Sequence, residues 1–302
     1  MQVAERYQLL QPITRGGMGD LWEGTDIRLN RRVAVKRIRR DRLSEETIRR
    51  FRREARLMAL LRHPGVPTVY DFGEDADGLF LVMEYIDGWS VAHVLDMHRP
   101  LPIPWVAMIG AQLCAVLSAT HAQQLIHRDL KPGNLMLCRD GSLVVLDFGL
   151  STVLNSTDFS KITRSMDRLG TDRYMAPENV TEGRADALTD LYGVGCLLYE
   201  MAIGQRVFEA PTIAVEVRGH LYSEPVSPVD MDPAMPYELD RLIMELLEKE
   251  PAKRPQAAEE VVHRLLPLAR DLPPLPGVVD QAVAPTQLYA AVLARSQGFV
   301  HL

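Results

Sequence analysis

The chain has 302 residues, 47% of them hydrophobic and 25% charged, the balance of an ordinary soluble globular protein with a substantial core. The first residues include Glu5 and Arg6 and contain no long apolar run, so we expect no secretory signal peptide. The most apolar segment, residues 105–119, is interrupted by Gln112 and Ser118, and we expect it to be too short to span a bilayer.

The three cysteines, Cys114, Cys138 and Cys196, are far apart in the sequence and lie in apolar surroundings. Their odd number and wide spacing argue against a disulfide framework and against a zinc site. We therefore expect free thiols in a reducing compartment and a cytoplasmic protein.

The net charge of −6 is unevenly distributed, because residues 28–62 hold 14 Lys/Arg against four Asp/Glu. Such a basic segment could contact nucleic acid or a membrane surface. The alternative is a solvated helix face with strand ends, in which one or two arginines bind an anion. No aromatic residues alternate with the arginines to form a base-stacking platform, so we favour the alternative and expect no nucleic-acid partner.

The first part of the chain predicts a small sheet with one main helix. Runs of apolar or alternating residues have the length of strands, and a glycine-rich stretch, ITRGGMGDLWEG, separates the first two. In residues 44–62, Ser44 precedes two glutamates as an N-cap, and apolar residues follow at spacings of three and four, as in one face of a helix. The predicted strands are 6–13, 20–24, 31–38, 66–73 and 79–86.

From about residue 90 the pattern becomes helical. Residues 104–124 form a long and largely apolar segment, as expected for a helix that is buried on most sides. A polar loop and two short strand-like runs follow. The predicted short strands are 134–138 and 143–148, and further helices are predicted near 188–203, 237–249 and 256–269.

The last part of the chain begins with LPPLPG at residues 272–277. The prolines end the last helix and predict an extended connector, which could be a plain linker or a docking motif. Residues 285–297 could form a short helix. We therefore divide the chain into residues 1–86, residues 87–270, and a proline-rich linker with a short tail at 271–302.

Four short motifs behind the glycine-rich stretch resemble the signature set of protein kinases. They are AVK at 34–36, HRDLKPGN at 127–134, DFG at 147–149 and APE at 176–178. The resemblance covers residues 7–266, and GGMG and GTDRYMAPE are most similar to bacterial Hanks-type serine/threonine kinases. It implies a bilobal α+β fold, with a small β-rich N-lobe that carries one main helix and a larger, mainly helical C-lobe. It also implies transfer of the γ-phosphate of ATP to Ser or Thr hydroxyls of protein substrates.

Phosphoryl transfer needs positioned reactants and neutralised charge more than covalent chemistry. Lys36 would supply a cation for the α- and β-phosphates, and Glu54 would fix the flexible lysine. Asp129 would orient or deprotonate the acceptor hydroxyl, and Lys131 would steady the γ-phosphate. Asn134 and Asp147 would supply oxygen ligands for Mg²⁺ or Mn²⁺.

The resemblance also implies a nucleotide pocket. Apolar side chains would line the adenine site, and backbone groups of Glu84 and Ile86 would bond the base. In the glycine loop, Thr14 stands where the family has its first glycine, so we expect altered nucleotide affinity or loop dynamics. The expected pocket residues are Ile13, Thr14, Gly16, Gly17, Met18, Gly19, Leu21, Ala34, Lys36, Met83, Glu84, Ile86 and Met136.

Arg128, beside Asp129, suggests a phosphorylation switch. An unpaired arginine at this place is costly unless an anion meets it, and a phosphate on the segment between DFG and APE would supply one. Thr163 and Ser165 lie nearest the positions that Hanks-type kinases autophosphorylate, which would require self-association if one copy modifies another. Thr171 would contact Asp129 and Lys131.

Two further contacts are implied for the C-lobe. Glu178 should pair with Arg254, and Asp190 should accept hydrogen bonds from the backbone of the HRD motif. The main alternative function is a pseudokinase that serves as a nucleotide-binding scaffold. A small-molecule phosphotransferase is disfavoured by GTDRYMAPE, and the presence of Lys36, Glu54, Asp129, Asn134 and Asp147 argues against the pseudokinase.

Overall fold

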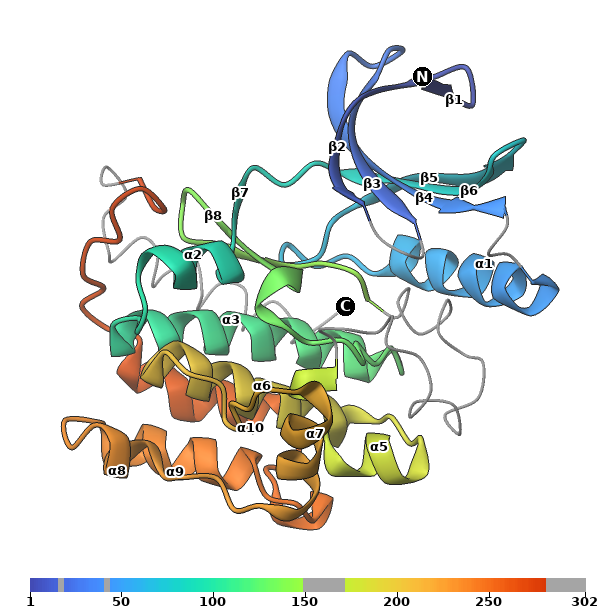
Figure 1. Ribbon diagram of the computed structural model, residues 1–302. Helices are drawn as coiled ribbons and strands as arrows, with labels where there is room; N and C mark the ends of the chain where they lie inside the picture. The colour runs from blue at the N-terminus through green and yellow to red at the C-terminus, as the bar shows by residue number, and fades with distance from the viewer. Residues whose placement is uncertain (16–18, 41–43, 149–171, 281–302) are drawn as a thin grey trace.

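In the computed structural model, an antiparallel sheet lies on one side and a group of helices on the other, and the chain passes between them after Glu84 (Figure 1). The structure describes residues 1–15, 19–40, 44–148 and 172–280, without the side chains of residues 46, 47, 50, 54 and 172. The predicted bilobal α+β architecture is confirmed.

The N-lobe is a six-stranded sheet in the order β1-β2-β3-β4-β6-β5, and every neighbouring pair is antiparallel. Side chains of successive residues in β4 point to opposite faces of the sheet. Val33 and Val35 join an outer cluster, whereas Ala34 and Ile38 join the main core. The strands are β1 Gln2–Val3, β2 Tyr7–Arg15, β3 Asp20–Asp26, β4 Arg31–Arg39, β5 Val69–Asp75 and β6 Gly78–Glu84.

Helix α1, Glu45–Leu60, covers the inner face of this sheet. Phe51, Ala55 and Met58 are fully or almost fully buried and belong to the same cluster as Ile38 of β4. The predicted helix over 44–62 is confirmed, because the spacing of three and four places these side chains on one face.

The C-lobe is built around α3, Ile103–Ala122, which packs against α6 and α10. α3 has the length and composition to cross a membrane, so the expectation that this segment is too short is wrong. However, 83% of its most apolar 18-residue stretch is buried inside the fold, as in a core helix. The other helices of this lobe are α2 Val91–Met97, α5 Pro177–Glu182, α6 Ala187–Ile203, α7 Ile213–Tyr222, α8 Pro228–Met231, α9 Tyr237–Leu246 and α10 Ala258–Leu265, and its strands are β7 Gly88–Ser90, β8 Leu135–Cys138 and β9 Leu143–Val145.

Residues 271–280 lie packed on the C-lobe as a strap that has no helix or strand and turns at residues 276–278. Leu272 and Leu275 are buried, as are two valines that follow them. Proline cannot donate a backbone hydrogen bond, but its carbonyl can accept one. The Trp105 indole donates to the carbonyl of Pro273 at 2.8 Å, and His98 Nε2 donates to that of Pro276 at 2.9 Å. The proline-rich stretch thus contains no helix or strand, and its apolar side chains are used inside the fold.

We expect Leu275→Ala to lower the free energy of unfolding by about 2 kcal/mol, the low end for removal of a buried leucine side chain. The reason is that Leu275 is 3% exposed and packs in the main core. Urea unfolding followed by circular dichroism measures the change. Leu60→Ala is the matched control, because Leu60 is 74% exposed; equal losses in the two variants would mean that the strap does not stabilise the lobe.

Candidate active site

Lys36 lies on β4 and points to the inner face of the sheet, as Ala34 does two residues earlier. In the register of the sheet it is opposite Leu21 of β3 and Leu81 of β6. Its Nζ donates a hydrogen bond of 2.7 Å to Oδ1 of Asp147. A cation from the N-lobe therefore meets a carboxylate from the C-lobe.

Asp147 is held beside Asn134 by the short β8–β9 pair. Leu135 and Val145 are partners in this pair, so Asn134 precedes one strand and Asp147 follows the other at the same end. The backbone N–H of Leu146 also donates to the carbonyl of Asn134 at 2.8 Å. Two oxygen-bearing side chains, 13 positions apart in the numbering, are thus brought together.

The Asp147 carboxyl is kept in its charged form. Burial by itself would raise its pKa, but the Lys36 ammonium acts in the opposite direction through charge and hydrogen bonding, with smaller contributions from His127 and Lys131. The net effect is a pKa below the usual value for an aspartate. Asp147 is therefore an anion over the physiological pH range.

The two carboxylate oxygens of Asp129 have different surroundings. Oδ2 accepts hydrogen bonds from Lys131 Nζ at 2.9 Å and from Asn134 Nδ2 at 3.0 Å. Oδ1 is buried and has no hydrogen-bond partner among the residues that the structure describes. A buried acceptor without a partner is costly unless a donor reaches it, so this oxygen is suited to receive a hydroxyl group.

Asp190, near the start of α6, anchors the 127–134 loop. Its Oδ2 accepts from the backbone N–H of His127 at 2.9 Å and lies 2.8 Å from His121 Nε2, and its Oδ1 accepts from the N–H of Arg128 at 2.9 Å. Arg128 has a φ of 68°, which is unfavourable for a residue with a side chain. These hydrogen bonds offset that strain.

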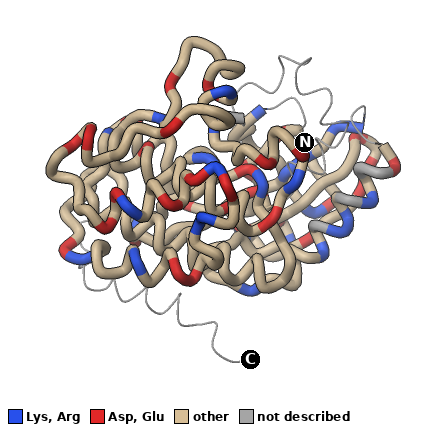
Figure 2. The backbone as a smooth tube through the Cα atoms, turned by 90° about the horizontal axis from the view of Figure 1, so that it is seen from below, with Lys and Arg blue, Asp and Glu red and all other residues tan. Residues whose placement is uncertain are grey.

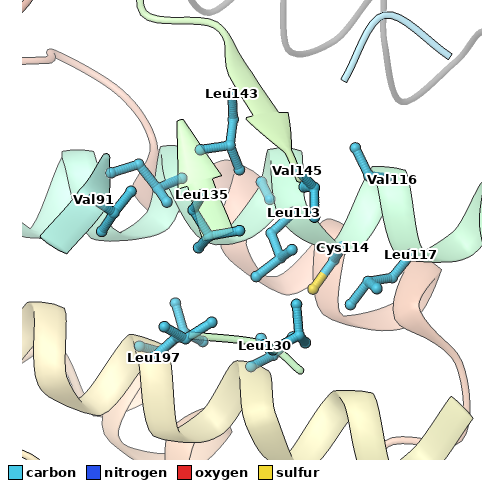
Figure 3. Packing of buried hydrophobic residues seen from close by; sticks show 14 of the residues in the cluster. Val91, Leu113, Cys114, Val116, Leu117, Leu130, Leu135, Leu143, Val145 and Leu197 are labelled. Atoms are coloured by element: carbon cyan, nitrogen blue, oxygen red, sulfur yellow. The ribbon is translucent and has the colours of Figure 1, made fainter. Parts of the chain in front are cut away.

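The 127–134 loop is also fixed by apolar packing against the core of the C-lobe. The buried side chain of Leu130 lies among residues of α3, β8 and α6, including Leu113 and Leu197 (Figure 3). Gly193 of α6 lets the helix approach, because a Cβ at this position would lie 3.2 Å from the Cβ of Leu130. The loop therefore shares the core of the C-lobe.

His127 connects this loop with Asp147. Its Nε2 donates to the carbonyl of Leu146 at 2.8 Å, and its Nδ1 accepts from the backbone N–H of Asp129 at 3.3 Å. Its ring also meets the ring of Phe148 edge to face, with centroids 4.7 Å apart. One histidine therefore holds together the segments that carry the two aspartates.

The part of the sequence that carries Lys36, Asp129, Asn134 and Asp147 also matches a known family. A family model described as the protein kinase domain matches residues 7–266, most of the chain. The chain belongs to the protein kinase domain family.

Curated relatives of this kinase domain come from several bacteria. It is 34% identical over 261 residues to the serine/threonine-protein kinase PrkC of Bacillus subtilis, covering 86% of this chain and 40% of the relative. It is 32% identical over 277 residues to the serine/threonine-protein kinase PknB of Mycobacterium leprae, covering 90% of this chain and 44% of that protein. The chain thus spans about two fifths of the length of these relatives.

The predicted adenine-site residues lie around the end of the kinase N-lobe. Ala34 of β4 and Met83 of β6 are register partners and are buried in the main core, and Leu21 of β3 packs against it. Glu84 ends β6, and Ile86 lies in the connection to β7. Met136, on β8, is half-buried in the C-lobe.

The glycine loop is described at its two ends. Thr14 is exposed in β2 opposite Leu21, a strand position that suits its branched side chain; Ile13, next to it, is 45% exposed. Gly19 is required by close contact, because a Cβ there would lie 2.1 Å from the carbonyl oxygen of Arg37. The predicted loop residues Gly16, Gly17 and Met18 lie outside the described residues.

Several regulatory predictions also fall outside what the structure describes. Glu54 lies on α1, but its side chain is not described, and the described partner of Lys36 is Asp147. Thr163, Ser165 and Thr171 lie in the segment that the structure does not describe.

Arg128 differs from the expectation in one respect. Its side chain is exposed, so its charge is solvated and the predicted cost of an unpaired guanidinium does not arise. An anion is therefore not required to stabilise it, although it is accessible to one.

Glu178 and Arg254, the predicted ion pair, lie in contact in the kinase C-lobe. Arg254 Nη1 and Nη2 donate to the two carboxylate oxygens of Glu178 at 2.6 and 2.9 Å. The arginine side chain is fully buried, and it also donates to the carbonyl groups of Leu188, Glu248 and Lys249. This bidentate contact ties the APE motif to the segment before α10.

The segment before the APE motif is held by contacts that the sequence did not predict. The carbonyl of Arg173 accepts from His220 Nε2 of α7 at 2.8 Å, and the Arg173 guanidinium lies 3.2 Å from the buried carboxylate of Glu216. Tyr174 donates to Glu200 of α6 at 2.6 Å. These partners lie on two helices, α6 and α7, and only the motif GTDRYMAPE marked the segment as important.

We expect stability to fall by up to about 3 kcal/mol as pH drops from about 6.5 to about 4, because His220 is protonated in the unfolded state but not in the folded state. Burial, with a smaller effect of the Lys249 ammonium, lowers the pKa of His220 to about 4, although its hydrogen bond to the carbonyl of Arg173 acts in the opposite direction. The folded pKa is lower than the unfolded one, so this contribution is complete above pH 6.5 and is lost below it.

Urea unfolding of the wild type and of His220→Gln, over about pH 7.5 to pH 4.5, measures this dependence. His220→Gln should be less stable near neutral pH and should show a flatter curve. His263→Gln, at an exposed histidine of α10, should leave the slope unchanged. An unchanged slope in His220→Gln would rule out this histidine as the source.

Proposed function

We propose that this chain is an ATP-dependent serine/threonine protein kinase. The observation that carries the proposal is Asp129, with one carboxylate oxygen held by Lys131 and Asn134 and the other buried without a described partner. The names of the relatives, which are serine/threonine-protein kinases, support it.

In the proposed reaction, the acceptor Ser or Thr hydroxyl donates a hydrogen bond to Oδ1 of Asp129. The hydroxyl oxygen forms a bond to the γ-phosphorus of ATP while the bond to the β-phosphate oxygen breaks and ADP leaves. The hydroxyl proton passes to Asp129. Lys131, 2.9 Å from Oδ2, is placed to offset charge that develops on the transferred phosphoryl group.

Lys36 would bind the α- and β-phosphates of the nucleotide. Its ammonium is already positioned by Asp147 at 2.7 Å, so binding of ATP does not carry the entropic cost of ordering the lysine side chain. Two buried residues beside Lys36, Ala34 on the same face of β4 and Leu81 opposite it on β6, exclude water from its base.

The residues of the proposed metal site fit Mg²⁺ or Mn²⁺. The amide nitrogen of Asn134 is used in two hydrogen bonds to Asp129, which leaves its carbonyl oxygen as a ligand. Asp147 binds Lys36 through Oδ1, so Oδ2 remains for the metal, and its lowered pKa keeps it anionic. When bound, the metal would neutralise part of the charge on the phosphates.

We further propose that Thr163 and Ser165 are autophosphorylated and that an exposed Arg128 contacts the resulting phosphate. Self-association for phosphorylation between two copies belongs to the same proposal. Mass spectrometry after incubation with ATP identifies the modified residues, and labelling that spares both positions would contradict it.

Incubation of the chain with γ-labelled ATP and a generic basic protein tests the main proposal. We expect label on serine or threonine in the presence of Mg²⁺ or Mn²⁺, and none when EDTA removes the metal. A thermal shift by ATP, measured separately, reports nucleotide binding. A nucleotide-induced shift without any transfer to protein would instead indicate the pseudokinase scaffold.

A further inference from the structure

A hollow of about 250 Å³ opens beside Lys131, between the 127–134 loop and α2. Arg173 and Tyr174, from the short 3₁₀ turn Asp172–Tyr174, form part of its wall. Lys131 also contacts Asp129, the proposed base, at 2.9 Å. An acceptor polypeptide whose hydroxyl reaches Asp129 therefore passes beside this hollow, and the position of the wall bears on how well that polypeptide binds.

Arg173 is held from α7 at two points. Its backbone carbonyl accepts from His220 Nε2 at 2.8 Å, and its side-chain Nε lies 3.2 Å from Glu216 Oε2. The contact with Glu216 is ionic, because neither of these two atoms has a hydrogen-bond partner among the residues that the structure describes. The Arg173 side chain is 32% exposed and lines the hollow, so its outer N–H groups are accessible to a ligand there.

Glu216 is itself fixed in place. Its side chain is 1% exposed, and its Oε1 accepts from Arg206 Nη2 at 2.9 Å and from the backbone N–H of Ala210 at 3.4 Å. One carboxylate oxygen therefore anchors the side chain, and the other lies beside Arg173. Arg206 shares the carboxylate with Arg173 but does not line the hollow.

The charges around this carboxylate act at short range. Figure 2 shows Lys and Arg gathered along α1 at one edge of the molecule, whereas blue and red segments are interspersed over the rest of the described chain. No extended area of one sign surrounds Glu216 in this view. A change of its charge should therefore be felt mainly by its two arginine neighbours.

We propose that Glu216 is a positioning residue for the acceptor polypeptide. It holds the Arg173 guanidinium at the hollow, where the outer N–H groups donate to carbonyl groups of the bound acceptor. An arginine that is ordered in advance loses less rotamer freedom when a ligand binds. The inference rests on the proposed kinase function, and it concerns affinity for the acceptor rather than the transfer step.

The test uses initial rates of the whole chain with labelled ATP and a range of concentrations of myelin basic protein. Glu216→Gln keeps the shape of the side chain but removes its charge. It should raise the KM for the acceptor about threefold to tenfold, with kcat and the KM for ATP unchanged. Arg173→Gln should raise the KM for the acceptor at least as much. The double variant should equal Arg173→Gln alone, because Glu216 acts through Arg173.

Arg206→Gln is the matched control. It removes the 2.9 Å hydrogen bond to the same carboxylate, but Arg206 lies outside the hollow, so the KM for the acceptor should not change. Circular dichroism confirms that each variant is folded. If Glu216→Gln does not accumulate in folded form, Glu216→Asp takes its place, since it withdraws the carboxylate from Arg173 and should raise the same KM.

Three results would overturn the inference. The first is an equal rise of the KM for the acceptor in Arg206→Gln, which indicates that the cluster only stabilises the fold. The second is an unchanged KM in Glu216→Gln, and the third is a further rise in the double variant over Arg173→Gln. Absence of transfer by the wild type would contradict the proposed function and this inference together, whereas the three results above leave the proposed function standing.

Discussion

Asp129→Asn is expected to lower kcat by about a thousandfold, which corresponds to about 4 kcal/mol of transition-state stabilisation. The new side chain has the same shape, and its carbonyl oxygen can keep the hydrogen bonds from Lys131 and Asn134. Its amide group then takes the place of Oδ1, so an acceptor of the hydroxyl proton becomes a donor. Binding of ATP should change little, because the proposed phosphate and metal contacts are made by other residues.

Initial rates with labelled ATP, together with the nucleotide-induced thermal shift, separate these two effects. Asp230→Asn is the control, because Asp230 is exposed on α8 and far along the chain from the site. If Asp129→Asn keeps more than about a tenth of kcat, a role of this residue as base would have to be abandoned.

Arg254→Ala is expected to lower the free energy of unfolding by about 3–5 kcal/mol, the usual cost of breaking a buried ion pair from one side. The substitution leaves the buried carboxylate of Glu178 without its cation, and three carbonyl groups lose a donor. The arginine side chain is 0% exposed, so water does not replace these contacts. Chemistry at Asp129 should be affected only through the loss of folded protein.

Guanidinium unfolding at fixed pH measures the change. Arg241→Ala is matched in residue type and also breaks an arginine–glutamate pair, with Glu245, but that arginine is 64% exposed. It should cost less than about 1 kcal/mol. If Arg254→Ala fails to accumulate in folded form, Glu178→Gln gives a milder measurement. Similar costs for the buried and exposed pairs would contradict the expectation.

The parts of the fold that follow from local pattern could be predicted from the sequence. The alternation of β4 and the spacing of Phe51, Ala55 and Met58 on α1 are properties of a few neighbouring residues. The short helices α2 and α7 were missed, because seven to ten residues with mixed burial give a weak periodic signal. The proline-rich strap read as a linker because composition does not reveal that Trp105 offers it a donor.

The site shows the same limit at longer range. Motifs identified Lys36 and Asp147, but the 2.7 Å contact between them joins residues 111 positions apart. Two residues of the site region were not predicted at all. His121 contacts Asp190 on α6, and Glu216 contacts Arg173 in the segment GTDRYMAPE. Their roles depend on how α3, α6 and α7 pack, which no spacing in the sequence reports.

The attachment of the 127–134 loop to Asp190 has a consequence for how the protein loses activity. A loop tied by two hydrogen bonds to a residue 2% exposed, and by Leu130 to the core, unfolds with the C-lobe as one cooperative unit. On heating, inactivation should therefore coincide with melting of the helical lobe. Loosening confined to the sheet would act through Lys36 instead, and would weaken the hold on nucleotide while Asp129 stays in place.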